Sequence, residues 1–517
     1  MQADCKHRSD NNSCSNNSER SCAMAHRNDE VSCFKTMHYK PVLYVIGLLL
    51  MTLAALMCIP FLTNVILDTP SHRMAFTASP LITLGVGLAL WRSCRTELFG
   101  LRSREIFLLT NLSWIMVCVF GALPFIFETE ISFTDAFFET MSGITTTGST
   151  VLVGLDSMNP GILMWRSVLQ WLGGIGFIVM AVAVLPFLKV GGMRLFQSES
   201  SDWSEKVMPR SGVIAKRIVQ VYIGLTFLCG WAYHLGGMTI FEAINHSMTT
   251  LSTGGYSTSD ASMGNFANPA VHWTGTLFML LGSLPFVLLV RFFSGSAEPL
   301  WKDCQVRGFL KLLVFVWLTM TMWLIWNSEY SAFEALTLVA FNTTSVISTT
   351  GFALTDYSLW GGFAGASFFL LSFIGGCSGS TSGGVKIFRF QLGLKLLDVQ
   401  LKLMSHPRAC FSIQYNGQPI TSEITRSFVG FTFFFLMLTG IMTLLLSLMG
   451  LDFITSLTGA VTAIANVGPG LGDIIGPAGN FSSLPDMAKW VLSIGMLMGR
   501  LEIITVLVMF TKAYWQR

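Results

Sequence analysis

The chain has 517 residues, of which 52% are hydrophobic and only 12% are charged. A soluble globular domain carries about 25% charged residues, so this composition excludes an ordinary soluble protein and indicates a surface that faces lipid. The 48 glycines fit a helical membrane protein, in which close helix contacts use small residues. The formal net charge of +3 is uninformative by itself, and we expect no nucleic-acid partner.

The first 36 residues form a polar tail. They are rich in Asn, Ser and Arg and contain no apolar run of the kind that a signal peptide needs, so we predict a disordered tail at 1–36. Membrane-like sequence begins directly after Met37, which is a candidate for the native start. Scattered cysteines and histidines in and near the tail have no compact C-x-x-C spacing, so we expect no zinc site among Cys5, Cys14, Cys22, Cys33, His7, His26 and His38.

Ten apolar segments are long enough to span a bilayer, which takes about 20 residues. They lie at 42–66, 75–91, 106–127, 162–188, 213–236, 271–292, 308–326, 364–391, 427–449 and 487–511. Four shorter segments follow the third, fifth, seventh and ninth spans, at 132–149, 239–256, 333–352 and 453–470. These four are too short to cross and predict re-entrant pore helices with loops, because non-helical backbone at that depth must line a water-filled cavity or be buried in protein.

The distribution of Lys and Arg predicts the orientation. The stretches 127–165, 233–290, 327–385 and 427–488 contain neither residue, so they are predicted to lie on the outer side. Basic residues concentrate in the intervening linkers, which are therefore predicted to be cytoplasmic: Arg92, Arg95, Arg102 and Arg104; Lys189, Arg194, Lys206, Arg210, Lys216 and Arg217; Arg291, Lys302, Arg307 and Lys311; and Lys386, Arg389, Lys395, Lys402, Arg408 and Arg426. The four re-entrant loops then enter from outside.

The four re-entrant segments are copies of one pattern. They end in ITTTGST, LSTGGYST, ISTTGFAL and IANVGPGL. Aligning Gly148, Gly255, Gly351 and Gly468 places a small hydroxyl residue six positions earlier in every copy: Ser142, Thr249, Ser345 and Thr462. Two positions before the glycines stand Thr146, Thr253, Thr349 and Asn466. The repeat therefore predicts four units, each an outer helix, a pore segment and an inner helix (M1–P–M2).

Glycine has a physical reason at the aligned position. A loop that points successive carbonyls at one axis needs backbone dihedrals that side chains resist and glycine adopts without cost. A ring of such carbonyls can replace the hydration shell of a cation such as K⁺. A single glycine turn after a membrane helix would mean little, but four turns in register on the same side favour a pore.

The residues that carry this repeat resemble the Trk/Ktr/HKT superfamily of cation transporters, and more narrowly the Trk-type potassium-uptake subunit of bacteria. The matching stretches are FTDAFFETMSGITTTGST, QWLGGIGFIV, GGCSGSTSGGVKIFR, NVGPGLG and GRLEIITVLV, and the likeness extends over roughly 37–517. The stretch GSLPFVLLVRFF in the second repeat is less typical of the family. The resemblance implies an all-α polytopic membrane protein with four pseudo-fourfold, potassium-channel-like M1–P–M2 repeats and two extra N-terminal transmembrane helices.

The expected domain boundaries follow: two extra helices at 37–92 and repeats at 93–190, 191–293, 294–391 and 392–517. The resemblance implies potassium uptake across the bacterial inner membrane, with no cofactor and K⁺ as the transported ion. It implies that K⁺ binds at Thr146, Thr147, Gly148, Thr253, Gly254, Gly255, Thr349, Thr350, Gly351, Asn466, Val467 and Gly468. It also implies a homodimer and cytosolic nucleotide-binding regulatory subunits of the RCK type. The alternative is a sodium-permeable relative, in which serine replaces the first filter glycine; Gly148 favours potassium.

Two features predict gating elements. The run at 375–386 places several glycines inside the third M2 segment, where a regular helix is unfavourable because each glycine costs about 1 kcal/mol relative to alanine. It is either a flexible intramembrane loop under the filter, as the resemblance implies, or a helix break packed against neighbours. Arg500 lies in the last span, where a lone cation is costly and usually faces a partner or a watery cavity. We expect the cavity, with a salt bridge as the alternative, and the expected gating residues are Gly376, Gly379, Gly383, Gly384, Lys386 and Arg500.

Acidic residues gather on the predicted outer side. Asp260, Asp356 and Asp473 each stand five positions after a filter glycine. They either form an anionic vestibule that concentrates cations or are ordinary solvated loop charges. No convergent set of His, Asp or Glu at one membrane face suggests an enzyme; His234, His246 and His272 match no metal spacing.

Overall fold

The structure is a computed structural model that describes residues 38–68, 75–95, 102–183, 207–409 and 411–516. The tail predicted at 1–36, the candidate start Met37 and the basic linker residues Lys189, Arg194 and Lys206 lie outside these residues. Over the part that is described, the chain is almost entirely helical. Its strands are a two-residue antiparallel pair, β1 (Gln414–Tyr415) and β2 (Gln418–Pro419). The predicted all-α membrane fold is confirmed.

Two apolar helical segments precede the repeats. α2 (Tyr39–Leu56) continues after a break of one residue as α3 (Cys58–Ile66) and packs along α4 (Ala75–Ser93). The two helices meet at glycines: a Cβ placed on Gly47 would lie 2.8 Å from the carbonyl oxygen of Gly87, and one on Gly87 would lie 3.0 Å from that of Gly47. Small residues thus let the backbones approach, as is usual between membrane helices.

Helices of the four predicted repeats follow in chain order. The first group comprises α5 (Ser103–Gly121), α6 (Leu123–Thr129), α7 (Phe133–Ile144), η1 (Leu155–Ser157) and α8 (Pro160–Ala183). The second comprises α11 (Val207–Leu235), α12 (Ile240–Leu251), η4 (Ser262–Asn265), α13 (Pro269–Gly282) and α14 (Phe286–Phe293). The third comprises α15 (Glu298–Lys302), α16 (Cys304–Asn327), α17 (Ala332–Ile347), η5 (Tyr357–Trp360), α18 (Gly362–Leu371) and α19 (Ile387–Ser405). The fourth comprises α20 (Ser422–Leu448), α21 (Phe453–Ala465), α22 (Asp486–Arg500), α23 (Ile503–Leu507), η6 (Val508–Phe510) and α24 (Lys512–Gln516).

The short helices α7, α12, α17 and α21 are the predicted pore helices, and all four begin in the same way. A side-chain oxygen of the residue before the helix accepts the backbone N–H three residues later, which satisfies one of the amides that a helix start leaves free. The pairs are Ser132 with Asp135 (3.1 Å), Thr239 with Glu242 (3.3 Å), Ser331 with Glu334 (3.3 Å) and Asp452 with Thr455 (3.0 Å).

The second helices of the repeats differ from one another. Of the ten predicted spans, the described residues form seven long apolar helices, or up to nine if two bent pairs each count as one span. The span predicted at 271–292 bends by 104° between α13 and α14, and that at 487–511 bends by 111° between α22 and α23. The span predicted at 364–391 is helical in α18 and again from the start of α19, and the chain leaves the helix between them. Gly375, Gly379 and Gly384 have φ of 72°, 77° and 72° there, which no right-handed helix accommodates.

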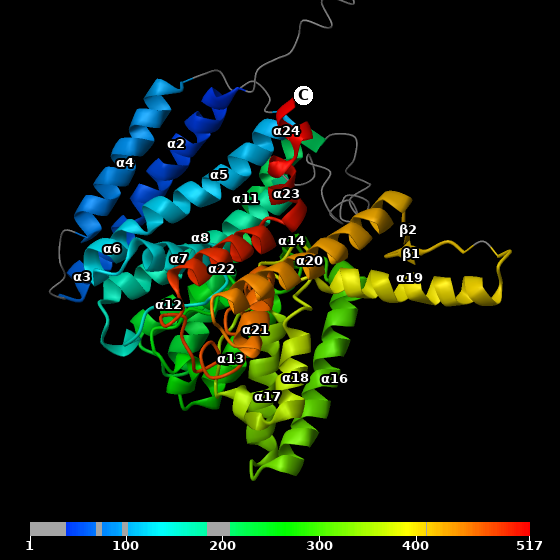
Figure 1. Cartoon of the computed structure of the whole chain (residues 1–517). Coiled ribbons are helices and arrows are strands. Elements are labelled where there is room, and N and C mark those ends of the chain that lie inside the picture. The colour runs from blue at the N-terminus through cyan, green and yellow to red at the C-terminus, as the bar shows by residue number, and fades with distance from the viewer. Residues whose placement is uncertain (1–37, 69–74, 96–101, 184–206, 410, 517) are drawn as a thin grey trace, which may run out of the picture.

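Figure 1 shows the consequence for the arrangement. α16, α17 and α18 lie together, whereas α19 projects away from the remaining helices before the chain returns through β1 and β2 to α20. Several large apolar side chains of this projecting helix are exposed: Phe390, Leu394, Leu397, Leu401 and Met404.

The glycine contact between α2 and α4 gives a stability prediction. Gly87→Leu should lower the thermal unfolding temperature, because its Cβ would press on the backbone of α2, and overpacking of this kind costs about 1–3 kcal/mol. Gly85→Leu is the matched control on the same helix, since nothing lies within 4 Å of a Cβ at that position. Equal unfolding temperatures for the two purified variants would contradict the close crossing.

Candidate functional site

All four pore helices end in one left-handed residue. Its φ is 53° at Thr146, 53° at Thr253, 57° at Thr349 and 54° at Asn466. Asn tolerates this conformation, but a β-branched threonine rarely adopts it, so three of the four turns hold a backbone that the residue itself disfavours. Such strain persists only where the surrounding structure imposes it.

A common pair of hydrogen bonds imposes this turn. The amide that follows the left-handed residue donates to the carbonyl five residues back, and the left-handed residue donates to the next carbonyl along the helix, which is the Schellman arrangement. The longer-range bonds run from Thr147 to Ser142 (2.8 Å), Gly254 to Thr249 (2.9 Å), Thr350 to Ser345 (2.8 Å) and Val467 to Thr462 (2.9 Å). The hydroxyl residues aligned in the sequence thus provide the accepting carbonyls.

The aligned glycines then close a ring. Their φ values are 90° at Gly148, 78° at Gly255, 85° at Gly351 and 104° at Gly468. A Cβ on each ring glycine would overlap a backbone carbonyl oxygen of another loop, and that oxygen belongs to the residue just before the other loop's glycine. The overlaps are Gly148 with the carbonyl of Gly254, Gly255 with that of Thr350, Gly351 with that of Val467 and Gly468 with that of Thr147. The cycle returns to its starting loop, so the structure brings together all twelve residues predicted to bind the ion. We call these twelve residues the ring.

One loop of the ring departs from fourfold symmetry. The Gln170 side chain, from α8, donates to the carbonyl of Gly254 (2.6 Å) and accepts the amide of Tyr256 (3.0 Å). Its amide group occupies the space that a side chain at Gly254 would need. This explains why the second loop has glycine where the others have Thr147, Thr350 and Val467.

A buried ion pair supports the first loop from behind. Arg166 of α8 contacts Glu139 of α7 at 2.8 Å, and both side chains are at most 1% exposed. Glu139 also accepts the amide of Val151 (2.9 Å), while Arg166 donates to the carbonyl of Ser257 (2.9 Å). The guanidinium lies 4.0 Å from the ring centre of Tyr256, so one network joins the loops of the first two repeats. This ion pair was not predicted from the sequence. The signal that could have revealed it is Arg166, a single arginine within the apolar span predicted at 162–188.

Glycines of the inner helices let them approach the ends of the pore helices. A Cβ on Gly173 or Gly499 would overlap the carbonyl oxygen of Ile144 or Ile464, and one on Gly282 would lie 2.9 Å from that of Leu251. Each of these carbonyls stands four residues before a ring glycine. The inner helices therefore contact the pore helices directly at their C-terminal ends.

The interrupted segment between α18 and α19 packs against these same ends. The Thr381 hydroxyl donates to the carbonyl of Gly282 (2.8 Å). The amide of Gly383 donates to the side-chain oxygen of Thr349 (2.6 Å), and that of Gly384 donates to the carbonyl of Ala465 (2.7 Å). The carbonyl of Gly379 accepts the amide of Phe286, at the start of α14 (3.0 Å). The segment is thus a packed, hydrogen-bonded break in the helix that touches the second, third and fourth repeats.

Arg500 ends α22 beside this segment and is 1% exposed. It donates to the carbonyls of Thr381 (2.8 Å) and Gly173 (3.3 Å), and its guanidinium lies 4.2 Å from the ring centre of Phe177. The alternative of a salt bridge is wrong: none of the ion pairs among the described residues includes Arg500, and nearby Glu502 pairs with Arg389 at 2.6 Å after the chain bends.

Two residues assigned to a cytoplasmic linker are buried instead. Lys386 is 4% exposed and donates to the carbonyl of Ser382, and Arg389 is 3% exposed. The distribution of Lys and Arg alone placed them in a linker, whereas the structure packs both against other helices. The cavity lined by this region holds about 10 Å³, about enough for one water molecule; it is bordered by Phe177, Ser382, Gly383, Gly384, Lys386, Phe431, Gly499, Arg500 and Glu502.

Two of the three acidic residues of the predicted outer loops have structural partners, while Asp473 is exposed. Asp260 accepts the amide of Gly154 (3.0 Å) and so joins the first two loops, and Asp356 accepts the amide of Ser358 (2.9 Å) at the start of η5. Within the described residues, no group of three or more His, Cys, Asp or Glu side chains could hold a metal ion.

Comparison with known proteins fits this architecture. Residues 72–517 match the TrkH family, described as a cation transport protein. The chain therefore belongs to the TrkH family. It is a Trk-type, TrkH-like multi-pass membrane subunit.

Relatives of the TrkH family match along nearly their whole length. The chain is 51% identical to the Trk system potassium uptake protein TrkI of Halomonas elongata, over 93% of this chain and 97% of that protein. It is 38% identical to the Trk system potassium uptake protein TrkH of Salmonella typhimurium, over 93% of this chain and all of that protein. The crystal structure of the potassium transporter TrkH from Vibrio parahaemolyticus superposes with a TM-score of 0.85 at 36% identity, covering 93% of this chain and all of that one.

The buried ion pair behind the ring gives a second stability prediction. Arg166→Met should destabilise the protein by about 3–5 kcal/mol, because Glu139 would remain buried without its partner. The double variant Glu139→Gln with Arg166→Met should recover much of that loss. Thermal unfolding of the purified variants measures both.

An exposed pair serves as the control for this experiment. Lys302 and Glu298 form an ion pair on the surface, with side chains at least 70% exposed, and Lys302→Met should leave the unfolding temperature nearly unchanged because solvent screens the pair. An equally small effect of Arg166→Met would show that the buried network does not support the loops.

Proposed function

We propose that this chain takes up potassium across the bacterial inner membrane by conducting K⁺ through the ring. The observation that carries the proposal is the closed cycle of contacts among Gly148, Gly255, Gly351 and Gly468. Four backbone turns of one geometry that meet around one axis are what a cation site made of carbonyl oxygens requires. The potassium-uptake names of the TrkI and TrkH relatives support the same ion.

The pore helices favour a cation on their C-terminal side. A helix carries about half a negative charge at its C-terminus, and the ends of α7, α12, α17 and α21 all converge on the ring. Flow through such a site would be passive and driven by the membrane potential.

The segment at 375–386 is proposed to gate this path. It lies across the inner side of the ring, bonded to Thr349 and Ala465, and leaves a cavity of about 10 Å³. A space of that size is too small for a hydrated ion, which supports a closed state of the proposed gate. Opening would require Gly383 and Gly384 to release these bonds, and the positive φ of Gly379 and Gly384 suits a segment that moves between two backbone arrangements.

Potassium is favoured over the sodium-permeable alternative at the first loop. Gly148 has a φ of 90° and no room for a Cβ beside the carbonyl of Gly254. A serine there would displace the carbonyl, so glycine is consistent with an intact ring of four equivalent turns.

Partners are proposed from the family and from the surface. The apolar face of α19, with Leu394, Leu397 and Leu401 exposed by 69%, 56% and 56%, supports a homodimer. Basic side chains near the predicted cytoplasmic face, such as Arg307, Lys395 and Lys402, support docking of cytosolic nucleotide-binding subunits of the RCK type. Nucleotides would then bind to those subunits and not to this chain.

Gly148→Ser should weaken discrimination between K⁺ and Na⁺. The serine resists a φ of 90°, and its Cβ would overlap the carbonyl oxygen of Gly254. Gly154→Ser is the control: it carries similar strain at a φ of 77°, but the nearest atom to its Cβ is the Ser157 hydroxyl oxygen, at 3.8 Å. The K⁺ to Na⁺ flux ratio in proteoliposomes should fall several-fold for Gly148→Ser alone. An unchanged ratio in a well-folded Gly148→Ser protein would disprove the assignment of this loop to the filter.

Arg500→Ala should increase uptake of K⁺ or Rb⁺ per folded molecule. Two unit charges about 6 Å apart repel by roughly 3 kcal/mol at an effective dielectric of about 20, so the increase could reach about a hundredfold. The variant also removes the hydrogen bond that holds Thr381. Arg500→Lys, which keeps the charge, should change uptake less, and the exposed Arg408→Ala should not change it. A fall in uptake for Arg500→Ala would exclude a barrier at this residue.

A further inference from the structure

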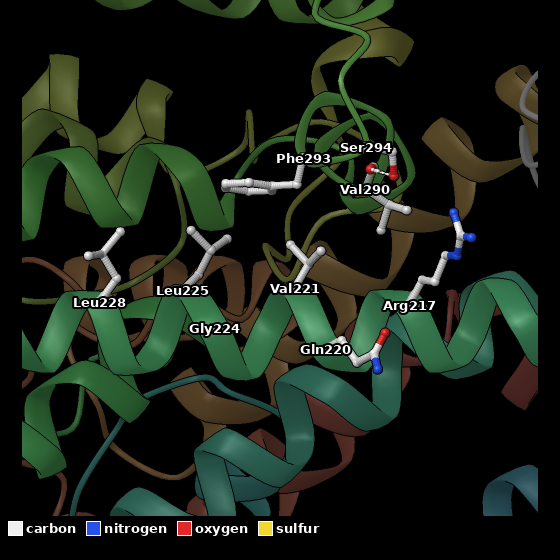
Figure 2. Close-up of a pocket in the computed structure, with 9 residues that line it drawn as sticks. All are labelled: Arg217, Gln220, Val221, Gly224, Leu225, Leu228, Val290, Phe293 and Ser294. Atoms are coloured by element: carbon white, nitrogen blue, oxygen red, sulfur yellow. Dashed lines mark hydrogen bonds between the residues drawn. The ribbon is translucent and has the colours of Figure 1, made fainter.

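The bend between α13 and α14 opens a groove on the outside of the helix bundle. α14 turns away from α13 by 104°, so it leaves α11 partly uncovered. The groove has a volume of about 650 Å³ and lies between α11 and α14 (Figure 2). It is lined by Arg217, Gln220, Val221, Gly224, Leu225, Leu228, Val290, Phe293 and Ser294. α14 lies in the stretch GSLPFVLLVRFF, whose sequence is less typical of the family.

The groove has the length of one membrane leaflet. Its α11 residues recur every three or four positions, so they form one face of the helix. From Arg217 to Leu228 the helix rises about 16 Å at 1.5 Å per residue, and half of a 30 Å hydrocarbon core is about 15 Å. An acyl chain of one leaflet would therefore extend along Val221, Gly224 and Leu228 without leaving the groove.

The two ends of the groove differ in polarity. Arg217 is exposed and points to the side of α11 on which α14 lies (Figure 2). Lys216 precedes it on α11, and Arg291 stands on α14 between the lining residues Val290 and Phe293. These residues belong to linkers predicted to face the cytoplasm. The other end is apolar, with Leu228 and Phe293 exposed by 53% and 57%. Basic residues at one end of an apolar leaflet-length groove complement an anionic headgroup with its acyl chain.

We propose that this groove binds an anionic phospholipid of the cytoplasmic leaflet, with its phosphate at Arg217 and an acyl chain along α11. The middle of the groove is open, because nothing of the protein lies within 4 Å of a Cβ on Gly224. The opposite wall is attached to the interrupted segment, since the amide of Phe286 at the start of α14 donates to the carbonyl of Gly379. A bound lipid would thus stabilise the helix that holds one end of the interrupted segment.

Native mass spectrometry of the purified full chain tests the proposal, with phosphatidylglycerol and phosphatidylcholine as probes. The wild type should retain phosphatidylglycerol in preference to phosphatidylcholine. Arg217→Gln should weaken phosphatidylglycerol binding by about fivefold, which corresponds to the roughly 1 kcal/mol that one basic residue contributes near an anionic surface. Gly224→Leu should remove the bound lipid, because a Cβ at that position has nothing within 4 Å and the added side chain extends into the groove.

Gly440→Leu on α20 is the matched control, since that glycine also has nothing within 4 Å of a Cβ and lies outside the groove. It should leave lipid binding unchanged. Three outcomes would overturn the proposal: no preference for phosphatidylglycerol, equal losses of lipid in Gly224→Leu and Gly440→Leu, or a cross-link in Leu228→Cys between position 228 and residues 184–206 with no lipid retained. The last would show that the linker occupies the groove instead.

Discussion

The whole arrangement depends on a backbone constraint that recurs four times: two left-handed conformations within three residues at the end of each pore helix. The first occurs at Thr146, Thr253, Thr349 and Asn466, and the second at the ring glycines. A left-handed conformation costs about 1–2 kcal/mol at a residue with a side chain. The Schellman hydrogen bonds, the capped helix starts and the buried contacts behind the loops must offset that cost. Because hydrogen bonds fix both ends of each pore helix, the carbonyls of the following loop are held in fixed positions, which a flexible loop could not do.

The elements around the ring are unequal although the ring itself repeats. α8 continues as one helix through its described length. The chain bends sharply after α13 and after α22, and α18 ends at Leu371 before the interrupted segment. A single chain permits this, because each copy can change separately while the turns stay alike. The interrupted segment belongs to the third repeat but is held by three repeats. It forms hydrogen bonds from Thr381 to Gly282, from Gly383 to Thr349 and from Gly384 to Ala465.

The repeat and the ring glycines could be predicted from sequence because both follow from local patterns. Four apolar pairs with a short segment between them indicate the topology, and glycine marks the position that tolerates no Cβ. The left-handed threonines gave no such signal, since threonine normally avoids that conformation and only the assembled turns impose it. The partners of Arg166 and Glu502 were also out of reach, because both pairs join helices whose relative placement no single segment encodes. Lys386 was misplaced for the same reason: its burial follows from the packing of a helix break against other repeats.

The bend after α22 explains why a cation is left uncompensated next to the ring. Glu502 has a φ of 59° and lies beyond a turn of 111°, which directs its carboxylate to Arg389 and away from Arg500. Arg500 instead donates to two carbonyls and faces the ring of Phe177, and its Nε has no hydrogen-bond partner among the described residues. A guanidinium buried without a carboxylate is unfavourable by several kcal/mol, and the negative ends of the nearby helices α7 and α21 offset part of that cost. Under the proposed function the same helix ends would stabilise a transported cation, and Arg500 and the ion would then compete for one electrostatic site.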